Sequence, residues 1–363
     1  MKVLHLSSER TWRGGEQQIA YLLEELTNRH VENVVLARKE SAFEKYCQEK
    51  NIPVYGLSFR NAIDIGTAKA IKTVCSQHGI DIVHMHSAKS HSLGVLSAAM
   101  GNPTPLVLSR RVIFPPGTSW FTRWKYNHRS IRKVICVSDK IKSIMQDYLN
   151  EPGKCVTVHS GIDTNKFANS TKHGKLRKEL NIPAGIFLVG NTSALEAEKD
   201  YPTFIRTIES LVKGNHPVAG VIMGSGSLEG DLKKLVGELS LTDRVIFTGH
   251  RKDVVEVLAD LDCFLMTSTQ EGLGTSILDA FAARIPVVAT KAGGIPEMVH
   301  HEQTGLLGPI GDAPALASNI SRLISEPSLR NSLVANAHHT LHEFSKEQMA
   351  EKTLAIYREV LAQ

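Results

Sequence analysis

Two carboxylates, Glu271 and Asp279, lie eight residues apart in the stretch 266–279. The apolar run 263–266 predicts a buried strand, and the apolar pattern that follows Gly274 predicts a helix. A strand, a glycine-containing loop and a helix N-terminus together present backbone N–H groups and the positive end of a helix dipole, which favours a bound anion. The segment indicates an anion site framed by two carboxylates, and an ordinary βα loop with an acid at the helix start is the simpler alternative.

Histidines and glycines also lie where predicted strands end. His84 and His86 close a strand that begins at residue 81, and their side chains point the same way if the strand is regular. Gly14 and Gly15 follow the first strand at a predicted helix start, where the lack of a side chain permits close approach of a phosphate. Each feature has a plain alternative, because two histidines form an incomplete zinc site or a hydrogen-bonded core pair, and most Gly-Gly pairs are tight turns.

The segment 110–133 holds seven Lys and Arg residues and no acid, interleaved with aromatic residues. Basic and aromatic side chains together fit a membrane surface or a polyanion. The alternative is a solvated helix whose aromatic residues belong to the core. Nucleic acid is not expected as a partner, because no recognised nucleic-acid module accompanies the segment. The residues predicted to form this acceptor or membrane face are Arg110, Arg111, Arg123, Trp124 and Lys125.

Length and composition describe a protein of two domains. A chain of 363 residues is long enough to bury two cores. Its net charge of +5 is uneven, because residues 1–165 carry 22 basic and 14 acidic side chains, whereas 166–363 carry 20 and 23. Five scattered cysteines without a CxxC pair favour a reducing cytoplasm and argue against a zinc site. The sequence lacks a signal-peptide pattern and a run of transmembrane length, so a cytoplasmic location is expected.

Buried strands alternate with amphipathic helices along both halves of the chain. This alternation predicts the α/β class, with doubly wound parallel sheets that carry helices on both faces. Ligands of such sheets bind at the carboxyl ends of the strands. The residues singled out above lie at such ends, so the two halves are expected to face one cleft.

The Glu271-x7-Asp279 spacing, the Gly293-Gly294-Ile-Pro-Glu297 turn and the text EGLGTSILDAFA resemble the signature of family 4 retaining glycosyltransferases. The family usually has Glu at the second carboxylate, so Asp279 is one methylene shorter. The resemblance covers nearly the whole chain and implies the GT-B fold of two Rossmann-like domains. It assigns residues 1–165 to acceptor binding, 166–342 to donor binding and 343–363 to a helix that crosses back. The polar stretch 169–178 is the predicted linker.

The resemblance also implies a role for each matched residue. Glu271 faces the donor sugar, Asp279 binds the ribose, His86 lies near the reacting sugar and Lys199 holds the donor phosphates. Asn191 stands where the family has an arginine, and the Gly14-Gly15 amides, Asn191 or Arg251 are the candidates to compensate. The donor-binding residues implied in this way are Gly14, Gly15, Asn191, Lys199, Gly224, Arg251, Gly274, Thr275 and Asp279.

The activity implied is transfer of a sugar from a nucleotide-diphosphate sugar to an acceptor hydroxyl, with no metal and no other cofactor. The acceptor would be a glycan or a lipid-linked molecule of cell-envelope, lipopolysaccharide or glycolipid synthesis, reached at the inner face of the membrane. Asp260-x-Asp262 matches the metal motif of the other glycosyltransferase fold and is interpreted as coincidence. The alternative functions are a nucleotide-sugar 2-epimerase, a phosphorylase or a non-catalytic sugar-nucleotide-binding protein.

Overall fold

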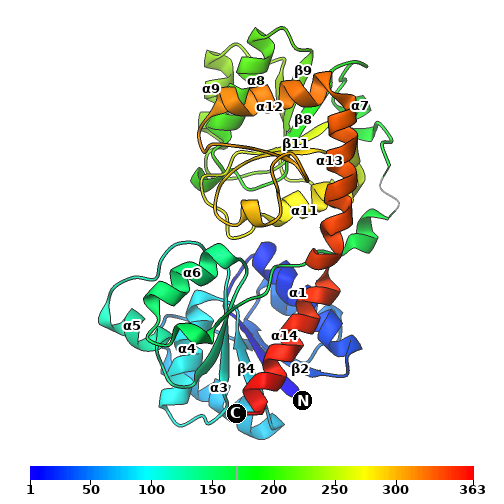
Figure 1. Ribbon diagram of the computed structural model, residues 1–363. Helices are drawn as coiled ribbons and strands as arrows, with labels where there is room; N and C mark the ends of the chain where they lie inside the picture. The colour runs from blue at the N-terminus through cyan, green and yellow to red at the C-terminus, as the bar shows by residue number, and fades with distance from the viewer. Residues whose placement is uncertain (169–170) are drawn as a thin grey trace. The chain divides into compact units, whose positions relative to one another are not determined.

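The computed structural model describes residues 1–168 and 171–363. Residues 1–161 and 345–363 form one unit, and residues 162–344 form a second (Figure 1). The boundaries predicted from the sequence, at 165/166 and 342/343, lie a few residues from these. We call the two parts the first unit and the second unit and describe each by itself.

Seven parallel strands form the sheet of the first unit, in the order β3-β2-β1-β4-β5-β6-β7. The chain order reverses beside β1, which pairs with β2 on one side and with β4 on the other, and ligands of such sheets bind at this switch point. The strands are β1 (Lys2–Ser7), β2 (Glu32–Arg38), β3 (Val54–Leu57), β4 (Ile82–Met85), β5 (Leu106–Arg110), β6 (Ile131–Cys136) and β7 (Cys155–Thr157).

Helices cover both faces of this sheet, as the amphipathic patterns predict. The last helix, red in Figure 1, lies against α1 and contributes Met349, Ala350 and Tyr357 to the same apolar cluster as Val3 and Tyr21. The helices of the first unit are α1 (Gly14–Asn28), α2 (Ala42–Glu49), α3 (Ile65–His78), α4 (Ala88–Ala99), α5 (Trp120–Tyr126), α6 (Asp139–Tyr148) and α14 (Lys346–Leu361), with a 3₁₀ turn, η1 (Pro152–Lys154).

Six parallel strands form the sheet of the second unit, in the order β10-β9-β8-β11-β12-β13. Its switch point lies between β8 and β11, and every residue of these two strands is buried, which explains their almost continuous apolar sequence. The two parallel sheets predicted from the sequence are thereby confirmed. The strands are β8 (Phe187–Asn191), β9 (Val218–Ile222), β10 (Val245–Phe247), β11 (Cys263–Met266), β12 (Val287–Thr290) and β13 (Leu306–Gly308).

The predicted linker 169–178 contains the start of a short helix, α7, and its residues 169 and 170 lie outside the described residues. No helix in the described part of the chain is long and apolar enough to cross a membrane. The helical segments of the second unit are η2 (Thr164–Phe167), α7 (Lys175–Glu179), η3 (Ala197–Lys199), α8 (Tyr201–Lys213), α9 (Glu229–Glu238), α10 (Val254–Val257), η4 (Leu258–Asp260), α11 (Thr275–Ala282), η5 (Ile295–Glu297), α12 (Ala313–Ser325), α13 (Pro327–Thr340) and η6 (Leu341–Phe344).

The Asp-x-Asp pair serves these loops rather than a metal. Asp260 accepts hydrogen bonds from the backbone N–H groups of Gly174 and Leu176, both at 2.7 Å. Asp262 accepts from the backbone N–H of Leu188 and forms ion pairs with two basic side chains of the α7 region. Both carboxylates therefore have structural partners, which agrees with the interpretation of the motif as coincidence.

Candidate active site

Lys199 and Glu271 lie at the carboxyl ends of neighbouring strands of the second unit. The chain leaves β8 towards η3, which ends at Lys199, and leaves β11 into the loop that holds Glu271. Lys199 Nζ donates to Glu271 Oε1 at 2.5 Å, and Ser268 Oγ donates to the same oxygen at 3.0 Å. Only 21% of the Lys199 side chain and 10% of the Glu271 side chain are exposed. A cation and a carboxylate that are distant in the sequence thus form one ion pair.

Backbone contacts hold this ion pair in place. Thr267 Oγ1 donates to the carbonyl of Lys199 at 3.0 Å, which fastens the β11 loop to the β8 loop. The N–H of Gly294 donates to the carbonyl of Glu271 at 3.1 Å, so the second glycine turn closes on the first. Three strand ends therefore share one hydrogen-bonded set of loops, which positions the charged side chains before any chemistry occurs.

The start of α11 has the geometry of an anion site. Gly274 precedes the helix with a φ of 93°, in the left-handed region that glycine adopts without steric cost. The first N–H groups of the helix, beginning at Thr275, have no partner within the helix itself. Asp279 lies further along α11 and is half-buried. Burial raises the pKa of Asp279 to about 7, and the charge of Lys166 opposes this rise. Its carboxyl group is thus poised between two protonation states at neutral pH.

Both polar atoms of the Asn191 side chain form hydrogen bonds inside the protein. Its Nδ2 donates to the carbonyl of Leu265 at 2.6 Å, and its Oδ1 accepts from Tyr201 Oη at 3.1 Å. Asn191 is also buried, because β8 extends one residue further than the sequence predicts and includes it. These contacts do not support Asn191 as a replacement for the arginine usual at this position.

Arg251 is likewise committed to partners within the second unit. It forms two hydrogen bonds with Glu179, at 2.6 and 2.9 Å, and two with Asp253, at 2.8 and 2.9 Å. The hydrogen bonds to Glu179 and Asp253 raise the pKa of Arg251. Two carboxylates neutralise this guanidinium, so its contacts do not support Arg251 as the compensating cation either.

The glycines of the predicted donor site have two different explanations. A Cβ on Gly224 would lie 1.9 Å from the carbonyl oxygen of Ser193, so the close approach of two loops requires glycine there. A Cβ on Gly14 or Gly15 would meet nothing within 4 Å, and neither residue has a positive φ. Packing explains Gly224 but does not explain Gly14 and Gly15, which begin α1.

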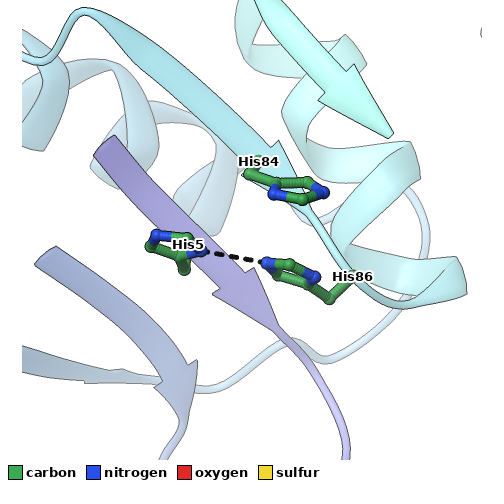
Figure 2. A group of neighbouring side chains, drawn as sticks. All are labelled: His5, His84 and His86. Carbon is green, nitrogen blue, oxygen red and sulfur yellow. Dashed lines mark hydrogen bonds between the residues drawn. The ribbon is translucent and has the colours of Figure 1, made fainter. Parts of the chain in front are cut away.

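Three buried histidines meet at the switch point of the first unit, and sequence reasoning missed the third, His5 (Figure 2). The parallel register of β1 and β4 places His5 beside His84. The position of His5 inside an otherwise apolar strand was the sequence signal that could have identified it. His84 Nδ1 lies 2.5 Å from Tyr357 Oη, and His84 Nε2 lies 2.8 Å from Ser109 Oγ. His84 is therefore a hydrogen-bonded core residue, as one of the two sequence alternatives holds.

His86 follows β4 directly and differs from His84 in its hydrogen bonds. Its Nε2 lies 3.0 Å from His5 Nδ1, whereas its own Nδ1 is buried and has no partner in the described part of the chain. Burial, with a smaller effect of the neighbouring histidines, lowers the pKa of His86 and of His84. This direction favours neutral rings. Five of the six ring nitrogens already take part in hydrogen bonds. One ring nitrogen of each histidine lies within 4.8 Å of the others, so a metal ion bound there would replace some of these hydrogen bonds.

Three basic residues of the predicted acceptor or membrane face turn inward. Lys125 Nζ donates to Ser92 Oγ at 3.1 Å, and burial lowers the pKa of Lys125. Arg110 donates to Tyr126 Oη at 3.0 Å. Arg111 is half-buried, and burial lowers its pKa to about 10. All three residues remain partly exposed, and their assignment to an acceptor or membrane face stays a prediction.

The same segment also carries exposed aromatic and basic side chains. Trp120 is 78% exposed and Phe114 is 55% exposed, and Arg123 and Arg129 are also exposed. Trp124 is half-buried, with its ring stacked on that of Trp120 at a centroid distance of 6.4 Å. We call Phe114, Trp120, Arg123 and Arg129 the α5 surface.

The sequence matches two family models that follow one another along the chain. Residues 12–166 match Glycosyltransferase Family 4, and residues 173–340 match Glycosyl transferases group 1. The N-acetyl-alpha-D-glucosaminyl L-malate synthase of Bacillus anthracis is 25% identical over 325 residues, which cover 87% of this chain and 84% of that protein. The lipopolysaccharide core biosynthesis glycosyltransferase LpsE of Rhizobium meliloti is 32% identical over 184 residues, about half of each chain.

Solved glycosyltransferase structures share the fold. Anabaena Alr3699/HepE, in complex with UDP and glucose, superposes with a TM-score of 0.84 at 22% identity and covers 99% of this chain and 100% of its own. WaaG, a glycosyltransferase involved in lipopolysaccharide biosynthesis, gives a TM-score of 0.73 at 17% identity over 98% and 99% of the two chains. With two matching family models, a relative matched over 84% of its length and this shared architecture, the chain belongs to the family 4 glycosyltransferases of the GT-B fold, and it is a glycosyltransferase.

Proposed function

We propose that this glycosyltransferase moves a sugar from a nucleotide-diphosphate sugar to a hydroxyl group of a cell-envelope glycan or glycolipid, with retention of the anomeric configuration. The observation that carries the proposal is the ion pair of Lys199 with Glu271, held beside the N-terminus of α11 by hydrogen bonds between loops. Donors with a UDP leaving group are the first to test, because HepE, of the same fold, binds UDP.

On the donor side, each charged residue has a distinct task in this proposal. The Lys199 ammonium and the N–H groups at Gly274 and Thr275 stabilise the diphosphate, whose negative charge grows as it departs. Glu271 accepts hydrogen bonds from hydroxyls of the sugar ring, and Asp279 accepts them from the ribose. The ammonium and the amides supply the positive field that a divalent ion supplies in other enzymes, so we propose that transfer needs no metal.

The chemical step exchanges one bond at the anomeric carbon for another. The bond from that carbon to the phosphate oxygen breaks, and the acceptor oxygen bonds on the face that the phosphate leaves. The acceptor proton passes to the departing phosphate, which becomes the nucleoside diphosphate. No protein nucleophile is invoked, because Glu271 is already an acceptor for Lys199 and Ser268 and is assigned to the ring hydroxyls.

The acceptor and the place of action are proposed from the first unit. His86 is proposed to lie near the reacting sugar, and Gly14 and Gly15 leave the start of α1 open to a phosphate. The α5 surface includes two exposed aromatic rings and two exposed guanidinium groups, a composition that suits anionic lipid headgroups. We propose peripheral binding at the inner face of the membrane. LpsE, which is similar to half of this chain, is named for lipopolysaccharide core biosynthesis, and this name supports a cell-envelope acceptor.

The test is a screen of nucleotide sugars by thermal shift, followed by transfer assays with the donors that stabilise the protein. A glycosylated lipid or glycan whose new linkage keeps the donor's anomeric configuration, seen by NMR, is the expected result. An epimerised nucleotide sugar would identify a 2-epimerase, and sugar release to free phosphate would identify a phosphorylase. Nucleotide binding without turnover of any donor would identify a non-catalytic sugar-nucleotide-binding protein.

A further inference from the structure

We propose that His5 and Asn33 are positioning residues that fix His86 in the tautomer whose Nδ1 is unprotonated, so that this nitrogen accepts a hydrogen bond from a substrate hydroxyl. The inference rests on the proposed function for the identity of the substrate. Its first part concerns only protons within the first unit, where a chain of hydrogen bonds runs from Asn33 through His5 to His86.

Asn33 determines the direction of the chain. Its Nδ2 lies 3.1 Å from the carbonyl of Val31 and 3.0 Å from Thr27 Oγ1. Thr27 Oγ1 already donates to the carbonyl of Leu23 at 2.8 Å, so it can only accept from Asn33. Two acceptors therefore identify this atom as the amide nitrogen, and the other amide atom, Oδ1, must be the acceptor that faces His5.

The protons on the two histidines follow from this orientation. His5 Nε2 lies 3.1 Å from Asn33 Oδ1 and must donate to it. Burial lowers the pKa of His5 to about 4, so the ring is neutral, carries one proton and presents a lone pair at Nδ1. His86 Nε2 lies 3.0 Å from that lone pair and donates to it (Figure 2). His86 is neutral too, so its Nδ1 has no proton.

His86 Nδ1, Arg110 Nε and Arg111 Nε are the buried side-chain atoms without a hydrogen-bond partner in the described part of the first unit. His86 Nδ1 is an acceptor without a donor, and Arg111 Nε is a donor without an acceptor in the described part of the chain. Both atoms are buried, and the charge of Arg111 is the smallest of the causes that lower the pKa of His86. Buried polar groups are almost always hydrogen-bonded, so the unpartnered acceptor of His86 needs an explanation. A substrate hydroxyl that donates to His86 Nδ1 would satisfy this acceptor.

The position of His86 fits a substrate contact. It directly follows β4, at the carboxyl end of the sheet and beside β1, where the strand order reverses. His84 lies two residues earlier in the chain. Both of its ring nitrogens are already hydrogen-bonded, so it offers no acceptor to a substrate. His5 does not need to touch the substrate, because it acts through the ring of His86.

The proton assignment is tested by ¹⁵N NMR of the histidine rings in the whole protein, with His86 identified through His86→Asn. We expect His86 to carry its proton on Nε2 and His5 to carry its proton on Nε2. A proton on His86 Nδ1 would overturn the proposal whether or not any transfer is observed. Binding of one equivalent of Zn²⁺ that shifts all three histidines would also overturn it, because the metal would take the lone pairs.

The functional part is tested with matched substitutions at position 5. His5→Leu removes the acceptor for His86 Nε2, so we expect a mixture of His86 tautomers and a fall in kcat of about ten- to a hundredfold, the usual effect of losing an outer hydrogen-bond partner. His5→Gln offers a carbonyl oxygen to the same N–H and should restore both the tautomer and most of kcat. Thermal unfolding of both variants shows whether the fold is kept.

Asn33→Asp provides a second variant, which should shift the His86 proton from Nε2 to Nδ1 rather than leave a mixture of tautomers. A carboxylate beside His5 favours a doubly protonated His5 ring, which would donate to His86 Nε2 and move the His86 proton to Nδ1. Adding the nucleotide sugar alone, or the acceptor substrate alone, to the wild-type protein shows which substrate hydroxyl perturbs the ¹⁵N signal of His86 Nδ1. An unchanged His86 tautomer and unchanged kcat in both His5→Leu and Asn33→Asp would refute a positioning role.

Discussion

Replacing Lys199 by alanine removes the cation that lies 2.5 Å from Glu271 Oε1. Glu271 would keep Ser268 Oγ at 3.0 Å but would lose its counter-ion where only 10% of its side chain is exposed. Breaking a buried ion pair costs about 3–5 kcal/mol, and breaking an exposed pair costs about 0.2–1 kcal/mol. This pair lies between those limits, so we expect Lys199→Ala to lower the free energy of unfolding by about 1–3 kcal/mol.

A double-mutant cycle with Glu271→Gln isolates the interaction. Glutamine keeps an acceptor for Lys199 and Ser268 while removing the charge. In the double variant no charge is left unpaired, so its loss of stability should be smaller than the sum of the single losses by about 1–2 kcal/mol. Urea unfolding of the four proteins at one pH measures this difference.

The same variants separate the tasks of the two residues in catalysis. Lys199→Ala should lower kcat/KM by about two orders of magnitude or more, since it removes one electrostatic stabiliser of the leaving group. Affinity for UDP should fall as well, while uridine should bind unchanged. Glu271→Gln should lower kcat but leave UDP affinity equal or raise it, because the carboxylate no longer competes with the diphosphate for Lys199. Lys199→Arg should restore activity only in part, since its planar fork is aimed differently.

Lys213 supplies a matched control in the same unit. It pairs with Glu209 at 2.6 Å on α8, but its side chain is 73% exposed. Lys213→Ala should change the free energy of unfolding by less than about 0.5 kcal/mol and leave kcat/KM unchanged. If the stability losses in the double-mutant cycle were additive, and if Lys199→Ala kept normal turnover and UDP affinity, Lys199 would be a surface lysine without a role in the active site.

Further predictions concern metal, membrane, phosphate and pH. Activity should persist in EDTA; loss in EDTA and rescue by Mn²⁺ would contradict the metal-free proposal. Arg123→Glu with Trp120→Ala should weaken binding to anionic vesicles, and the wild-type binding should fall with salt; equal binding to neutral vesicles would contradict the electrostatic account. Gly14→Ala and Gly15→Ala should leave the thermal unfolding midpoint unchanged, because a methyl group there meets no protein atom. The same substitutions should lower donor affinity, because the methyl group would occupy the space proposed for the phosphate. Unaltered donor affinity would remove both residues from the site. Burial raises the pKa of Asp279 from 3.8 to about 7, so the free energy of unfolding should decrease as pH rises from about 4 to 7, and Asp279→Asn should remove that slope; an identical pH profile would contradict the raised pKa.

The architecture was predictable because it depends on patterns within short segments. Runs such as 187–191 and 263–266 are apolar at nearly every position, which identifies strands buried on both faces, and amphipathic helices lie between them. Glycine and polar residues then mark the strand ends, so Lys199 and Glu271 could be placed at the carboxyl edge of a sheet from the sequence alone.

Side-chain partners were not predictable in the same way. Asn191 was expected near phosphate, yet it bonds to Leu265 and Tyr201 within the core. The hydrogen bond from Lys125 to Ser92 on α4 was likewise not predicted. Each outcome depends on a rotamer and on a partner many residues away, and neither the strand period nor the helix period carries that information.

The positive charges of the second unit suggest how donor binding and the position of Glu271 are linked. Arg251 is neutralised by two carboxylates, whereas Lys199 has one carboxylate partner, and the N-terminus of α11 has backbone N–H groups alone. Under the proposed function a diphosphate therefore draws on Lys199 and these amides, and in doing so it competes with Glu271 for the ammonium. A Glu271 carboxylate released in part from Lys199 becomes a stronger acceptor for the ring hydroxyls of the same donor. The ion pair would thus make sugar recognition depend on phosphate binding, which explains why the two residues should be tested as a pair rather than singly.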